Sequence, residues 1–185
     1  MPSRLNNRRG VYLITPDSPD TGQLLARLLP LLEAGPALLQ YRNKHADKTL
    51  REAQAAAVLA CCRAQGIPLL INDDWALAKA IGADGVHLGA SDGDPAMARE
   101  ALGPQALIGV SCYNNLPRAR QMAALDIDYL AFGAVFASTT KPDAVRADLS
   151  LFGEAKALGK ATVAIGGIRP DNCAQVQAAG ADFIA

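Results

Sequence analysis

The sequence predicts a (β/α)8 TIM barrel, in which eight parallel strands alternate with helices around a closed sheet. Short apolar runs of strand length alternate along the chain with stretches whose apolar residues recur at helical spacing. Segment 81–86 is echoed by segment 179–184, and in each a helix ends at glycine and a strand begins after aspartate. Seven strand–helix units and the opening of an eighth favour a barrel over an open doubly wound sheet.

The elements follow one another without a linker or a low-complexity tract. Helical spacing in the first two helices stops at Gly35 and Gly66, and a polar loop is expected at 137–148. The expected strands are 11–15, 37–41, 68–72, 85–88, 107–111, 129–132, 162–165 and 183–185. The expected helices are 21–34, 49–65, 74–81, 95–102, 116–125, 149–158 and 171–179. Residues 1–185 are therefore expected to form one TIM-barrel domain that is C-terminally incomplete, with its eighth strand and helix cut off.

Composition argues against several classes of protein. Half of the 185 residues are hydrophobic and 19% are charged, which favours a large core over disorder. Lys plus Arg and Asp plus Glu number 18 each, so a net charge of +0 argues against non-specific binding to nucleic acid or membrane surfaces. Four cysteines without a C-x-x-C pair argue against a zinc site or a disulfide framework. Without a membrane-spanning run or a signal peptide, the chain is expected to be cytoplasmic.

Polar residues that follow the predicted strands are the candidate site, because barrel active sites lie at the carboxyl ends of the strands. The set combines cations, carboxylates, hydroxyls and a glycine pair, which suits a phosphorylated ligand together with a divalent metal. These residues are Gln40, Arg42, Lys44, Asn72, Asp73, Asp92, Ser111, Asn114, Ser138, Thr139, Thr140, Lys141, Gly166 and Gly167.

Asp73 and Asp92 are the candidate metal ligands. They follow neighbouring strands of a parallel sheet, so both carboxylates would lie at one edge and could share a hard cation. Aspartate after a strand also commonly caps the next helix, but Asp74 and Asp94 are better placed for capping. Mg²⁺ is the expected ion, because it takes few protein carboxylates and completes its shell with phosphate and water oxygens.

Gly166 and Gly167 are the candidate phosphate cradle. They follow a strand and precede a helix, so their backbone amides and the helix N-terminus would face a phosphate. Tight turns also use glycine for backbone reasons, but the barrel context favours phosphate, which often binds after strands seven and eight.

Other residues have ordinary structural interpretations that stay open. Arg42 and Lys44 could be solvated surface charges, and Lys141 could belong to a flexible loop. His87 is expected to be a hydrogen-bonded strand residue, and Trp75 a packing residue.

Seven motifs, in order and at suitable spacing, resemble the thiamine phosphate synthase family, also called the thiamine-phosphate pyrophosphorylases. Each motif is weak alone, but together they cover the chain from about residue 11 to its end. They are Gln40-Tyr41-Arg42-Asn43-Lys44, Ile71-Asn72-Asp73, Gly85-Val86-His87-Leu88-Gly89 with Asp92, Gly109-Val110-Ser111, Phe132-Gly133 through Phe136, Ser138-Thr139-Thr140-Lys141, and Ala164-Ile165-Gly166-Gly167-Ile168.

The resemblance implies a role for each matching residue. Asp73 and Asp92 would bind Mg²⁺, and Ser138 and Thr140 would contact a thiazole phosphate, with Gly167 supplying backbone amides. A Val-Ile-Ser segment typical of the family, which completes that phosphate site, would fall just past residue 185. The residues expected to hold hydroxymethylpyrimidine diphosphate are Gln40, Arg42, Lys44, Asn72, Ser111 and Lys141.

The activity implied by the resemblance is transfer of the pyrimidine to the thiazole, giving thiamine phosphate and pyrophosphate. The expected mechanism is dissociative, with Arg42, Lys44, Lys141 and Ser111 as the catalytic set around the leaving diphosphate. Neither a nucleophile nor a general base is needed. The partners are then the two small-molecule substrates and, as a family-typical expectation, a second copy of the chain.

Three alternatives remain open at this point. A paralogue on the same barrel, such as a thiazole tautomerase-like protein, could lack the transferase chemistry. A regulatory barrel could bind a phosphate ligand without turnover, especially if a short eighth strand left the barrel open. A different phosphosugar enzyme is disfavoured by the two aspartates, since many such isomerases need no metal.

Overall fold

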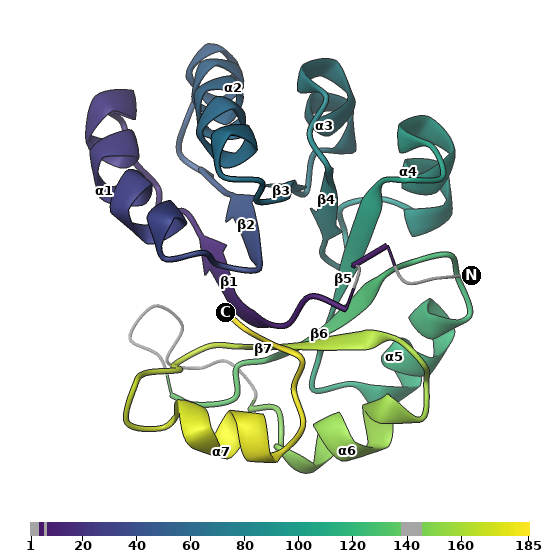
Figure 1. Cartoon of the computed structure of the whole chain (residues 1–185). Helices are drawn as coiled ribbons and strands as arrows, with labels where there is room; N and C mark the ends of the chain where they lie inside the picture. The colour runs from purple at the N-terminus through teal and green to yellow at the C-terminus, as the bar shows by residue number, and fades with distance from the viewer. Residues whose placement is uncertain (1–3, 6, 138–145) are drawn as a thin grey trace.

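Parallel strands close on themselves at the centre of the molecule, and helices surround them (Figure 1). The computed structural model describes residues 4–5, 7–137 and 146–185. In that part of the chain the strands are β1 (Gly10–Ile14), β2 (Leu38–Tyr41), β3 (Leu69–Asn72), β4 (Gly85–Leu88), β5 (Leu107–Tyr113), β6 (Tyr129–Gly133), β7 (Ala161–Ile165) and β8 (Phe183–Ile184). The helices are α1 (Thr21–Glu33), α2 (Lys48–Ala64), α3 (Trp75–Ile81), α4 (Pro95–Leu102), α5 (Leu116–Ala123), α6 (Ser150–Lys156) and α7 (Cys173–Ala178). The predicted TIM-barrel fold is confirmed.

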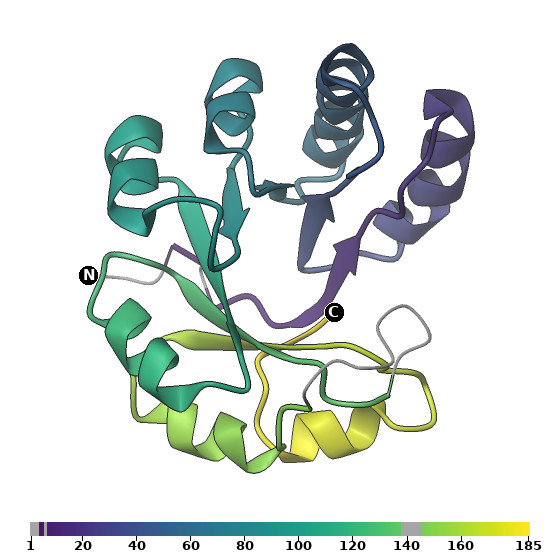
Figure 2. The ribbon, with the colours of Figure 1, turned by 180° about the vertical axis from the view of Figure 1, so that it is seen from behind.

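The short strand β8 closes the barrel. Phe183 pairs with Gly10 of β1 on one side and with Val163 of β7 on the other, both in parallel register. The end of the chain therefore lies beside β1, as both views of the ribbon show (Figures 1 and 2). The expectation that a short eighth strand could leave the barrel open is wrong.

Alternation along the strands divides the core into an interior and an outer layer. One buried cluster lies inside the barrel and includes Tyr12, Leu38, Tyr129 and Phe183. The alternate residues pack outward against the helices in two further clusters, one under α1 to α3 and one under α4 to α7. This period of two explains why polar residues inside the barrel share the parity of interior apolar ones.

A repeated aspartate pins neighbouring strands together at the amino-terminal side of the barrel. The carboxylates of Asp84, Asp128 and Asp182 precede β4, β6 and β8. Each accepts a backbone N–H at or beside the start of the preceding strand, from Leu69 (2.8 Å), Ile108 (2.7 Å) and Thr162 (2.9 Å). We call each contact a carboxylate lock. The locks at β4 and β8 are the physical basis of the sequence echo between 81–86 and 179–184.

Most element boundaries agree with the sequence to within two residues, and the differences have local causes. Strand β5 runs two residues further than predicted because a bulge between Ser111 and Tyr113 lets it continue its pairing with β6. Helix α7 begins at Cys173 rather than 171, because Asn172 uses its side chain in the preceding turn, where it accepts from the Arg169 N–H at 2.7 Å.

Candidate active site

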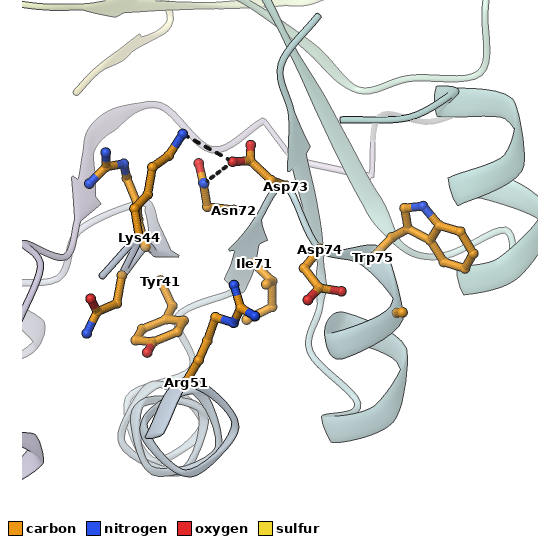
Figure 3. A pocket seen from close by; sticks show the side chains of 11 residues that line it. Tyr41, Lys44, Arg51, Ile71, Asn72, Asp73, Asp74 and Trp75 are labelled. Carbon is orange, nitrogen blue, oxygen red and sulfur yellow. Dashed lines mark hydrogen bonds and ion pairs between the residues drawn. The ribbon is translucent and has the colours of Figure 1, made fainter. Parts of the chain in front are cut away.

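A cavity of about 530 Å³ opens at the carboxyl ends of β2 and β3. Figure 3 shows the side chains of Lys44 and Asn72 converging on Asp73, while Trp75 points away from them. The residues that line this cavity are Tyr41, Arg42, Asn43, Lys44, Arg51, Ile71, Asn72, Asp73, Asp74, Trp75 and Ala76. The structure thus brings together four residues that the sequence predicted for one site: Arg42, Lys44, Asn72 and Asp73.

Asp73 is an acidic group of this cavity with an unusual backbone and a raised pKa. Its backbone lies in the left-handed region at φ 65°, which is uncommon for a residue other than glycine. Its carboxylate accepts the Asn72 amide at 2.7 Å and pairs with the Lys44 ammonium at 3.4 Å. Burial, followed by the nearby Asp92 carboxyl, raises the pKa of Asp73, and Lys44 opposes the shift. The Asp73 carboxylate therefore lies where a further cation would stabilise its charged form.

The Asp92 carboxyl lies near Asp73, and the helix-capping interpretation fails for both aspartates. Asp74 caps α3 by accepting from the Leu77 N–H at 2.8 Å. Asp94 caps α4 through the Ala96 N–H, also at 2.8 Å. Asp92 instead closes its own turn by accepting from Gly89 N–H at 2.9 Å.

The donor set fits a magnesium ion better than a softer metal. In the described residues no group of three or more His, Cys, Asp or Glu side chains gathers as a metal cage. Two neighbouring carboxylates at an open mouth would leave several positions for phosphate and water oxygens, which is how Mg²⁺ is commonly held. The residues that would hold it are Asp73 and Asp92.

The loop after β2 is held by residues that the sequence analysis did not single out. The Thr15 hydroxyl accepts the Arg42 N–H at 2.8 Å and donates to the Arg42 carbonyl at 2.9 Å. Asp17 pairs with the Arg42 guanidinium at 3.0 Å and also accepts the Lys44 backbone N–H. Partial burial raises the pKa of Asp17, but these contacts outweigh it, and the net shift is downward. Arg42 and Lys44 are thus anchored at the mouth, although Lys44 stays half exposed.

Helix α2 contributes Arg51 to the cavity wall and Gln54 to the buried layer behind it. Gln54 is fully buried, accepts from the Tyr41 hydroxyl at 2.9 Å and from the Asn43 amide at 2.9 Å, and so fixes the start of the loop after β2. Arg51 lies one turn earlier and reaches into the cavity (Figure 3). The signal for Gln54 was its position on the same helix face as Val58 and Cys62, where a polar residue needs a buried partner.

Gln40 and Ser111 lie inside the barrel rather than on the cavity wall. The Gln40 amide donates to the Tyr12 hydroxyl at 2.9 Å, and the Ser111 hydroxyl bonds His87 Nε2 at 2.9 Å. His87 also bonds the Tyr129 hydroxyl through Nδ1 at 2.8 Å, so the expectation of a hydrogen-bonded strand histidine is confirmed. Burial lowers the pKa of His87 to about 4, and the charge of Asp92 opposes this shift.

The glycine pair after β7 has a packing reason of its own. Gly166 and Gly167 have φ of 100° and 67°, and a Cβ at either would come within 2.6 Å of Ala134 or 2.4 Å of the Ala137 carbonyl. A helix N-terminus does not directly follow the pair, since α7 begins at Cys173. The phosphate role of this turn stays a prediction. Ser138, Thr140 and Lys141 lie outside the described residues.

The closed sheet and a cavity lined by Arg42, Lys44 and Asp73 define the class of protein: a TIM barrel whose candidate site lies at the carboxyl ends of its strands. The family model for thiamine monophosphate synthase matches residues 11–185. The chain therefore belongs to the thiamine monophosphate synthase family.

Individual relatives agree with this membership. The thiamine-phosphate synthase of Xanthomonas campestris pv. campestris (strain 8004) is 57% identical over 183 residues, which are 98% of this chain and 87% of the relative. That of Methylobacillus flagellatus is 55% identical over 177 residues, 96% of this chain and 85% of the relative. Among solved structures, the thiamine phosphate pyrophosphorylase from Pyrococcus furiosus is similar with a TM-score of 0.83 and 29% identity, over 98% of this chain and 86% of that one.

Proposed function

We propose that this chain joins hydroxymethylpyrimidine diphosphate to thiazole phosphate, producing thiamine phosphate and pyrophosphate. The observation that carries the proposal is the anchored pair Arg42 and Lys44 beside Asp73, in a chain whose relatives at more than 50% identity are named thiamine-phosphate synthases. The same identities disfavour the tautomerase-like, regulatory and phosphosugar alternatives.

The reaction is dissociative in this proposal. The bond between the exocyclic carbon of the pyrimidine and the diphosphate oxygen breaks, and both electrons leave with the pyrophosphate. The thiazole nitrogen then donates its lone pair to the resulting carbocation. Negative charge grows on the departing diphosphate, so cationic side chains aimed at it lower the barrier more than a nucleophile would.

In this proposal the side chains of the protein bind and orient the diphosphate and neutralise its charge. Arg42 and Lys44 line the cavity and would face the leaving diphosphate from one side, and the sequence resemblance assigns Lys141 to the same task. When bound at Asp73 and Asp92, Mg²⁺ would supply Lewis-acid stabilisation of the diphosphate oxygens. The Thr15 hydroxyl fixes the Arg42 backbone, and the Asp17 carboxylate holds the guanidinium at 3.0 Å, so the cation needs little reorganisation during the reaction.

The test is a product assay with both substrates and Mg²⁺, in which pyrophosphate and thiamine phosphate are measured together. We expect equal amounts of the two products, and loss of both when EDTA is added. Asp94→Asn is the control for substitution of the carboxylate of Asp73. Asparagine preserves the cap of α4, so turnover of this control should stay normal. Substrate binding without either product would refute the proposed reaction.

The proposal also covers location in the cell and oligomeric state. In the described residues no helix is long and apolar enough to cross a bilayer. We propose a cytoplasmic homodimer, which analytical ultracentrifugation and fractionation of the producing cells would test.

A further inference from the structure

A chain of hydrogen bonds, buried at Tyr12 and partly buried at His87, crosses the barrel interior from β2 to β5. The Gln40 amide nitrogen lies 2.9 Å from the Tyr12 hydroxyl, which lies 2.7 Å from the Tyr129 hydroxyl. The Tyr129 hydroxyl lies 2.8 Å from His87 Nδ1, and His87 Nε2 lies 2.9 Å from the Ser111 hydroxyl. We call these five side chains the interior relay. The roles derived so far use only its two ends, Gln40 and Ser111.

Packing holds the middle of the interior relay in one geometry. The Tyr12 and Tyr129 rings meet edge to face with centroids 5.8 Å apart, and the His87 ring stacks on Tyr129 at 5.6 Å. Tyr129 lies directly over Gly109, where a Cβ would come within 1.8 Å of the ring. Tyr12 and Tyr129 are 2% and 0% exposed, so water does not substitute for their partners.

The Gln40 amide nitrogen gives the interior relay a direction, because an NH₂ group can only donate. Tyr12 accepts this bond, and among the described residues its own hydrogen has only the Tyr129 oxygen as an acceptor. Tyr129 in turn donates to His87 Nδ1, which must be the unprotonated nitrogen of a neutral ring. The hydrogen of His87 then lies on Nε2 and is donated to the Ser111 oxygen.

We propose that Tyr12, Tyr129 and His87 are positioning residues that make Ser111 an obligate hydrogen-bond donor toward the barrel mouth. The Ser111 oxygen is already engaged by His87, so its own hydrogen is directed to an acceptor oxygen of the pyrimidine diphosphate. This inference rests on the proposed function for the identity of that acceptor. A serine free to rotate would lose part of this bond to competing orientations.

The kinetic test compares Tyr129→Phe, Ser111→Ala and the double variant. Tyr129→Phe keeps the ring but removes the bond that selects the His87 tautomer. We expect kcat/KM for the pyrimidine diphosphate to fall about 3- to 10-fold, the usual effect of one hydrogen bond, with KM for thiazole phosphate unchanged. On the Ser111→Ala background, Tyr129→Phe should cause no further loss, because its effect passes through Ser111.

Thr162→Val is the matched control for loss of a buried hydroxyl. Thr162 is fully buried on β7 and bonds Asp182 at 3.2 Å, away from the interior relay. We expect its kcat/KM to stay normal even if the protein is less stable. If Tyr129→Phe does not fold, Tyr12→Phe tests the same selection of the His87 tautomer, because it removes the preceding hydrogen bond of the interior relay.

A spectroscopic readout tests the direction without any turnover. Long-range ¹H–¹⁵N correlation of the histidine rings should show His87 as the Nε2–H tautomer in the unmodified protein. Gln40→Glu places an acceptor at the start of the interior relay and should shift His87 to the Nδ1–H tautomer. An Nδ1–H ring in the unmodified protein, or additive losses in the double variant, would overturn the inference. Absence of product from the unmodified protein would instead refute only the proposed reaction.

Discussion

Two aspartates at the amino-terminal side of the barrel contact the same two arginines, and we predict that only one of them matters greatly for stability. Asp128 pairs with Arg4 at 3.1 Å and Arg99 at 3.0 Å, and Asp126 pairs with them at 2.9 and 3.1 Å. The Asp128 side chain is 5% exposed and the Asp126 side chain 56%. Asp128 also accepts the Ile108 N–H as a carboxylate lock. Burial, rather than the number of ion pairs, separates the two.

The magnitude follows from this difference in burial. Asp128→Asn leaves two arginines near an amide in a desolvated site, and breaking such a buried pair costs about 3–5 kcal/mol of unfolding free energy. Asp126→Asn removes solvent-screened pairs that contribute under about 1 kcal/mol. For a chain of this size each kcal/mol shifts Tm by about 2–4 °C, so Asp128→Asn should lower Tm by roughly 6–20 °C.

The assay is urea unfolding followed by circular dichroism, with a thermal melt of each variant. Both substitutions remove one charge and keep side-chain size, so each serves as the control of the other. Equal losses in free energy of unfolding, or a larger loss for Asp126→Asn, would refute the argument that burial sets the value of these ion pairs.

Three further predictions concern the site, the thiols and acid stability. Asp73→Ala should lower kcat for pyrophosphate release by about 10²-fold or more if it holds the metal, and near-normal turnover at saturating Mg²⁺ would contradict that role. Burial raises the pKa of the Cys62 and Cys112 thiols to about 12, so a thiol reagent at pH 8 should leave both unmodified until urea is added; mass spectrometry of the labelled peptides reads this directly. Hydrogen bonding from Arg4 lowers the pKa of Asp126 in the folded state, so its stabilisation is present above about pH 4 and is lost as the pH falls through the folded value. Wild-type stability should therefore decline more steeply below about pH 4 than that of Asp126→Asn, as measured by urea midpoints across this range.

The barrel was predictable because the sequence signals that begin and end its strands and helices are local. Strand lengths, helical spacing and the turn residues at Gly66 and Gly82 each act within a few positions, and they place most boundaries within two residues. Differences arose where a side chain competes with the backbone, as at the turn of Asn172, or where a bulge extends pairing, as at Ser111. Neither the side-chain hydrogen bond of Asn172 nor the bulge at Ser111 leaves a periodic signal in the sequence.

The site was predictable only in part, for a geometric reason. Residues such as Arg42, Asn72 and Asp73 follow parallel strands, so their common edge could be inferred from order alone. Arg51, which lines the cavity, and Gln54, which supports Tyr41 behind it, come from a helix, and their places depend on how α2 packs against β2. Tyrosines of the interior relay read as ordinary core residues, because nothing in a single strand indicates that two hydroxyls from β1 and β6 will meet.

The carboxylate locks make the pair of strands, rather than the single strand–helix unit, the smallest repeating module of most of this barrel. Locks join β3 to β4, β5 to β6 and β7 to β8, each contained within one pair. A chain divided between β4 and β5 would keep all of them intact in two fragments, whereas a cut between β5 and β6 would separate Asp128 from Ile108. The boundary between β4 and β5 is thus a suitable junction for a split or recombined version of this protein, because it divides the barrel in half without breaking a lock.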